Sequence, residues 1–112
     1  MNAYEEEVYF MHISLEDKKW LIANHLGGLL INQCCTEEMA ELQICLSKFN
    51  RFDLEEFKNF DDRRKLEPNL IEEIAHVQFY IDIIKKLHNI SDTEILQEQE
   101  KRANKLIKIY DI

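Results

Sequence analysis

Glycine and proline are nearly absent from this chain of 112 residues, which contains two glycines and one proline. A collagen-like or low-complexity disordered chain would be rich in both residues, so the composition excludes these classes. Apolar residues make up 46% of the chain and charged residues 32%, a balance that is typical of amphipathic helices. The length suits one domain spanning residues 1–112 and leaves no room for a second core.

Basic residues and long apolar runs are also scarce. The 14 lysines and arginines are outnumbered by 22 aspartates and glutamates, which leaves a formal net charge of −8. General nucleic-acid binding requires a basic surface, so we expect no nucleic-acid partner. No window approaches the ~18 apolar residues of a membrane span, and residues 1–10 do not resemble a signal peptide. We therefore expect no membrane partner and a cytoplasmic location.

The three cysteines, Cys34, Cys35 and Cys45, are odd in number and lie in or near one predicted helix. Their spacing matches neither a disulfide framework nor the usual ligand set of a zinc site. We predict that they are buried or half-buried free thiols in a reducing compartment.

Helical periodicity covers most of the chain. We predict helices at residues 15–25, 29–50 and 70–88, and a last helix that opens with a capping box formed by Ser91 and Glu94. The pair Gly27-Gly28 marks a break or tight corner, and residues 61–65 are expected to form a solvated connection. Residues 1–13 fit either a short helix or an extended arm.

Four helices with short connections favour an all-α fold of the four-helix-bundle type. The apolar arc of the helix at residues 70–88 covers about half of its circumference, which is wider than one small monomeric bundle needs. We therefore expect a homodimer or a homotetramer to complete the bundle.

Several ionisable residues project into apolar faces instead of joining the polar ones. In the helix at residues 70–88, Glu73 and His76 point into the apolar arc. In the helix at residues 29–50, Glu38 falls inside the apolar stripe and Glu41 at its border, while Glu37 points away. A carboxylate in an apolar face is costly unless something compensates its charge.

Residues three apart share a helix face, so each helix carries one pair of such groups. If the two helices pack together, Glu38, Glu41, Glu73 and His76 converge, and a divalent cation bound through oxygen would neutralise the carboxylates. The alternative is that each acidic pair belongs to a solvated face and that His76 is a hydrogen-bonded core histidine.

The two acidic motifs also resemble those of a known family. The motif Glu-Glu-Met-Ala-Glu-Leu at residues 37–42 and the motif Glu-Glu-Ile-Ala-His-Val at residues 72–77 resemble the all-α nucleoside triphosphate pyrophosphohydrolases of the MazG type. The resemblance runs over residues 20–109 and is closest to the short single-domain members of phages and their bacterial hosts. That family holds Mg²⁺ with four carboxylates. Glu38, Glu41 and Glu73 match three of them, whereas His76 stands in place of the fourth, an aspartate.

The resemblance implies hydrolysis of nucleoside triphosphates, deoxynucleotides among them, to the monophosphate and pyrophosphate. It implies that Glu38 is a metal ligand in the catalytic centre and that Glu37 orients or deprotonates the attacking water. Tyr80 would lie near the sugar of the bound nucleotide. Weaker candidates for contacts to the base, the phosphates or the sugar are His12, Trp20, Lys48 and Asn104.

His76 leaves the cofactor and the activity open. Mg²⁺ coordinates imidazole poorly, whereas Mn²⁺, Fe²⁺, Ni²⁺ and Zn²⁺ accept it, so we expect Mg²⁺ or Mn²⁺ as the cofactor. The protein is then an active hydrolase using Mn²⁺, or using Mg²⁺ on the three carboxylates alone. Alternatively it binds nucleotides without turning them over, in a regulatory role. The last alternative is a vestigial site on a protein that binds another protein, as in phage–host conflict.

Overall fold

The computed structural model describes the backbone of residues 1–54 and 60–112, and the side chains of these residues except 9, 10, 52–54 and 60–63. The described backbone forms α-helices and contains no strand, so the predicted all-α class is confirmed. The helices are α1 (Ala3–Met11), α2 (Leu15–Leu54), α3 (Phe60–Leu87) and α4 (Asp92–Ile109). Within the described ranges, no helix combines the length and the apolar character that crossing a membrane requires.

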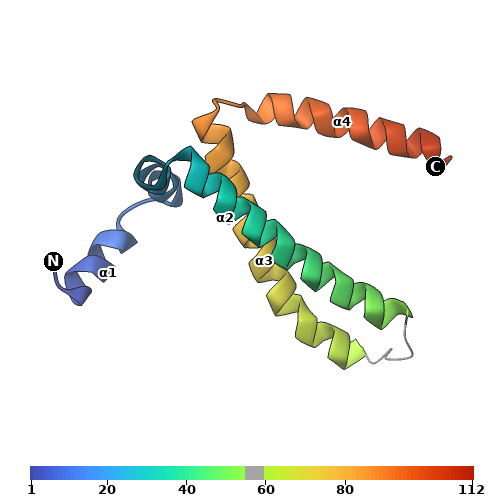
Figure 1. Ribbon diagram of the computed structural model, residues 1–112, viewed down its shortest axis with the longest axis horizontal. Helices are drawn as coiled ribbons and strands as arrows, with labels where there is room; N and C mark the ends of the chain where they lie inside the picture. The colour runs from blue at the N-terminus through green and yellow to red at the C-terminus, as the bar shows by residue number, and fades with distance from the viewer. Residues whose placement is uncertain (55–59) are drawn as a thin grey trace.

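The centre of the fold is the antiparallel pair of α2 and α3 (Figure 1). In the described part of the chain, these are the only two helices that pack against each other. Their seam buries aliphatic and thiol side chains, namely Ile31, Cys35, Cys45, Val77 and Ile83. Cys35 and Cys45 are buried, Cys34 is half-buried and all three are free thiols, as the sequence predicts.

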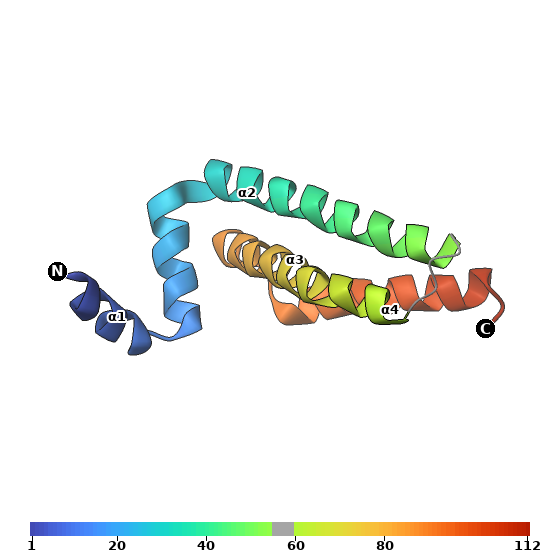
Figure 2. The ribbon, with the colours of Figure 1, turned by 90° about the horizontal axis from the view of Figure 1, so that it is seen from below.

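Gly27 bends α2 sharply, so that its first segment turns away from the direction of the second (Figure 2). The backbone of Gly27 has φ 80° and ψ 165°, a conformation that side chains disfavour and glycine tolerates. The break predicted at the glycine pair is therefore present. Because of the bend, Ala23 before it and Ile31 after it both pack in one cluster with Ile83 of α3.

The prediction of a solvated connection at residues 61–65 is wrong, because α3 begins at Phe60 and these residues are helical. Charged residues obscured the apolar period there, but Asp, Arg and Lys all tolerate a helix. Pro68 lies inside α3 and removes one backbone hydrogen bond, a cost that the rest of this long helix tolerates.

The two terminal helices do not pack against the central pair, and both run away from it in Figure 1. Residues 3–11 of the ambiguous N-terminal stretch form α1, and α4 buries none of its side chains. The capping box of α4 is complete, since Ser91 Oγ accepts from the N–H of Glu94 at 3.1 Å and the Glu94 carboxylate accepts from the N–H of Ser91 at 2.9 Å. The four-helix bundle itself stays a prediction.

The two adjacent glycines should respond in opposite ways to alanine. Gly27→Ala should destabilise the protein by about 1–3 kcal/mol, because the methyl group disfavours the backbone conformation that makes the bend. Gly28→Ala should stabilise it by roughly 0.5–1 kcal/mol, because this position has open space around it and no positive φ. Urea unfolding followed by circular dichroism measures both changes. Equal effects of the two substitutions would contradict this account of the bend.

Candidate metal centre

Glu38, Glu73 and His76 converge on one spot in the seam between α2 and α3. Each of the three offers one donor atom, and these atoms all lie within 4.8 Å of one another. Nδ1 of His76 lies 3.2 Å from Oε2 of Glu38, across the seam. The packing of the two helices therefore brings together residues that are 38 positions apart in the sequence.

Glu73 is the most buried member of the cluster, with only 6% of its surface exposed. Its Oε2 is fully enclosed and accepts no hydrogen bond from any described residue. Burial raises the pKa of the Glu73 carboxyl above its usual value, and a hydrogen bond between its protonated form and Glu38 raises it further. The negative charges of Glu38 and Glu41 act in the same direction, while His76 opposes them. The bare carboxylate is therefore unfavourable at this position unless a proton or a cation joins it.

The donor set of this cluster fits a divalent cation. Two glutamate side chains and one histidine side chain offer the oxygen and nitrogen donors that proteins use for such ions. Buried polar atoms nearly always have a partner, and a cation would supply the one that Oε2 of Glu73 lacks. The side chains of Glu38 and His76 are 25% and 45% exposed, so the cluster is open to solvent on one side.

The side chain of His76 is more exposed than its position in the apolar arc suggests. Glu41 is exposed, yet its charge acts on Glu73, which places it beside the cluster. That these residues are metal ligands remains a prediction.

Tyr80 borders the cluster one helical turn beyond His76. Burial raises the pKa of its phenol, and Cys34, Glu38 and Glu37 raise it further, so all three lie within electrostatic reach of the ring. Its ring also packs edge-on against Phe79, with the centroids 5.2 Å apart. Two predicted site residues therefore lie near the cluster: Glu37, the candidate for orienting the attacking water, and Tyr80, the candidate for contacting the sugar.

The other predicted nucleotide contacts are not gathered at the cluster. His12 is exposed in the link between α1 and α2, and Asn104 is exposed on α4, which does not pack against the central pair. Lys48 is half-buried ten residues beyond Glu38, about 15 Å farther along α2 at 1.5 Å per residue.

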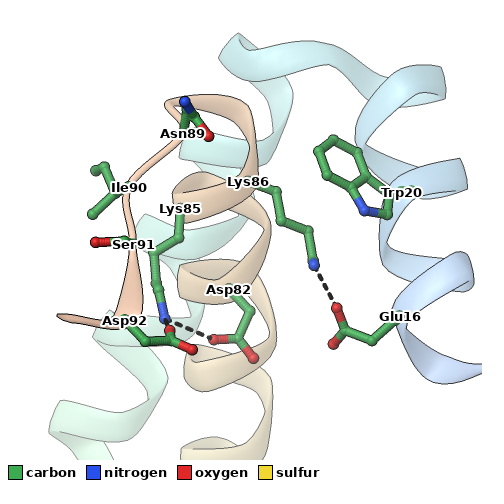
Figure 3. A pocket seen from close by; sticks show the side chains of 9 residues that line it. All are labelled: Glu16, Trp20, Asp82, Lys85, Lys86, Asn89, Ile90, Ser91 and Asp92. Carbon is green, nitrogen blue, oxygen red and sulfur yellow. Dashed lines mark hydrogen bonds and ion pairs between the residues drawn. The ribbon is translucent and has the colours of Figure 1, made fainter. Parts of the chain in front are cut away.

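Trp20 borders a separate groove of about 390 Å³ between the first segment of α2 and the end of α3 (Figure 3). The ammonium group of Lys86 lies 5.2 Å from the centroid of its ring and pairs with the carboxylate of Glu16. Asp82 also lines this groove, and nine residues at about 100° each place it on the opposite side of α3 from Glu73. Within one chain, the groove and the cluster therefore lie on different faces.

The sequence gives no signal for the ion pairs around this groove. Lys19 is 6% exposed, and its Nζ donates to Oδ2 of Asp82 at 2.9 Å. The hydrogen bond with Asp82 raises the pKa of Lys19 above its usual value, so Lys19 is charged at neutral pH. Lys19 is buried only because the bend at Gly27 lays the first segment of α2 over α3, and a helical wheel of either segment does not show this.

The fold and the cluster define an all-α protein with a candidate metal centre of two glutamates and one histidine. Comparison with known proteins extends this description no further, since no family model, curated protein or solved structure matches the chain.

Glu73→Gln should stabilise the cation-free protein at neutral pH, because glutamine keeps the shape of the side chain without the buried charge. The folded-state pKa of Glu73 is raised, so the protonated form is favoured at low pH and the penalty grows as the pH rises through that pKa. The gain in Tm should therefore be present at pH 7 and disappear at pH 4 and below. Thermal melts with a chelator present, at a series of pH values, measure it.

An equal gain in Tm at all pH values would contradict a buried charge at Glu73. Glu98→Gln is the matched control, because it makes the same exchange of a carboxylate for an amide at an exposed position on α4.

Proposed function

We propose that this protein hydrolyses nucleoside triphosphates to the monophosphate and pyrophosphate, with a divalent cation held by Glu38, Glu73 and His76. The observation that carries the proposal is the buried Oε2 of Glu73, which has no hydrogen-bond donor among the described residues and lies in a cluster built from two helices. The resemblance of the two acidic motifs to pyrophosphohydrolases of the MazG type supplies the reaction.

The cluster and the two glutamates near it would have different roles in the reaction. A cation bound by the cluster would neutralise part of the triphosphate charge and make a water molecule more acidic. Glu41, exposed beside Glu73, would add a third carboxylate next to the same cation. Glu37 is exposed, acts electrostatically on Tyr80 and does not belong to the three-residue cluster, so its carboxylate is free to orient or deprotonate that water.

The second candidate function is nucleotide or protein binding without hydrolysis, in a regulatory or phage–host role. It is favoured by the position of Trp20, whose groove lies on the other side of α3 from Glu73. If the base of a nucleotide stacked on Trp20, its triphosphate would not reach the cluster along one face of the same chain.

We also propose that the chain is a homodimer or a homotetramer. Its accessible surface is 9272 Å², whereas a compact monomer of this mass would expose about 6,500 Å². The difference of roughly 2,700 Å² per chain, or about 5,400 Å² for two chains, lies at the upper end of what obligate subunit interfaces bury. Large apolar side chains are exposed on several helices, as in Leu29, Ile44, Ile71, Leu96 and Ile107.

Incubation with a panel of ribo- and deoxyribonucleoside triphosphates and Mn²⁺ or Mg²⁺ should release pyrophosphate from at least one of them. Glu73→Gln should lower the rate at least about 100-fold, because partners of metal ligands alone contribute 10–100-fold. Glu98→Gln, on α4, should leave the rate unchanged.

If nucleotides quench the fluorescence of Trp20, which is the only tryptophan, and no pyrophosphate appears, the binding-only function replaces the hydrolase. If nucleotides cause no quenching and no pyrophosphate is released, both nucleotide functions are contradicted.

The mass in solution tests the oligomer. Light scattering after size exclusion should give about 27 or 54 kDa, which is two or four times 13.5 kDa. Leu106→Glu, in the exposed apolar face of α4, should lower that mass, whereas Lys105→Glu on the polar side of the helix should not. A wild-type mass of one chain would contradict the proposal.

A further inference from the structure

The three donors of the candidate centre are two oxygens and one nitrogen. We propose that this centre selects a divalent cation of the first transition row, such as Mn²⁺ or Zn²⁺, over Mg²⁺, with Nδ1 of His76 as a ligand. The inference rests on the proposed metal site and deepens it by naming the class of cation that the site takes.

Donor chemistry separates the two classes of cation. Mg²⁺ prefers oxygen ligands in a near-ideal octahedron and gives up its waters reluctantly. Imidazole nitrogen suits transition-row dications, whose affinities for such sites rise from Mn²⁺ towards Cu²⁺. Because one of the three protein donors is a nitrogen, only the two carboxylates of the cluster would hold Mg²⁺.

The geometry of the pair across the seam fits joint ligation. Two adjacent ligands bonded to one cation at about 2.0–2.2 Å lie about 3.0–3.5 Å apart. Nδ1 of His76 and Oε2 of Glu38 are 3.2 Å apart. The same nitrogen would then be a neutral donor, with the proton of the ring on Nε2.

Burial of Glu73 also favours a transition-row cation over Mg²⁺. Glu73 is 6% exposed and its Oε2 is enclosed, so the inner side of the centre has little room for the waters that Mg²⁺ retains. A cation that accepts three protein ligands directly, with solvent only on the open side of Glu38 and His76, fits this enclosure better.

The competing arrangement is a hydrogen bond in which Nδ1–H of His76 donates to Glu38 and only orients that carboxylate. His76 would then be a positioning residue, and the cation would be held by oxygen alone. The two arrangements differ in whether nitrogen is bonded to the metal, and this difference can be measured without any substrate.

The experiment uses the full chain, stripped of metal with a chelator and free of nucleotide. Calorimetric titration with Mn²⁺, Zn²⁺ and Mg²⁺ should show that the wild type binds Mn²⁺ and Zn²⁺ at least about tenfold more tightly than Mg²⁺. Pulsed electron paramagnetic resonance of bound Mn²⁺ should show coupling to ¹⁴N. His76→Asp should remove that coupling and reduce the preference for Mn²⁺ over Mg²⁺ about tenfold or more.

His25→Asp is the matched control, because His25 is exposed on the first segment of α2 and the substitution adds the same charge away from the centre. This variant should keep both the coupling and the preference. Circular dichroism of each variant verifies that the helices are retained.

Equal affinity for Mg²⁺ and Mn²⁺ in the wild type, or bound Mn²⁺ without nitrogen coupling, would overturn the inference and leave the proposed hydrolase standing. Failure to bind any of the three cations would overturn the metal site itself and the proposed hydrolase with it.

Discussion

Burial of the Glu73 carboxylate between α2 and α3 is the constraint on which the candidate centre depends. An anion removed from water and placed next to other carboxylates is unfavourable, and no described residue donates a hydrogen bond to its Oε2. An aliphatic residue would fill this position of the seam at lower cost, as Val77 does one turn away. Either a proton or a bound cation would relieve this charge, and the proposed metal site connects the fold to the proposed chemistry through the second of these.

The bend at Gly27 gives the short chain two distinct surfaces. Beyond the bend, α2 runs along α3 and forms the seam with the acidic cluster; before it, the first segment crosses the end of α3 and buries Lys19 against Asp82. Trp20 and its groove belong to this second surface. The position of a single glycine therefore separates the predicted aromatic contact from the predicted metal ligands within one chain.

The proposed oligomer would complete the packing of the single chain. Only α2 and α3 share a core among the described residues, and α4 has well-formed caps but no buried side chain. Local hydrogen bonds account for the ends of α4, whereas an amphipathic helix of this length usually depends on packing of its apolar face. Subunit association would provide that packing and would also bring the surfaces of different chains together.

Helical content, the break at Gly27 and the inward projection of Glu73 follow from the sequence alone, because the helical period and glycine conformation act over a few residues. The helical start at Phe60 was missed, because charged residues there hide the period. Only the tertiary structure decided that Glu38 meets His76 and that Lys19 meets Asp82. A helical wheel shows which face a residue occupies, but the bend and the register of two packed helices determine which residue lies opposite.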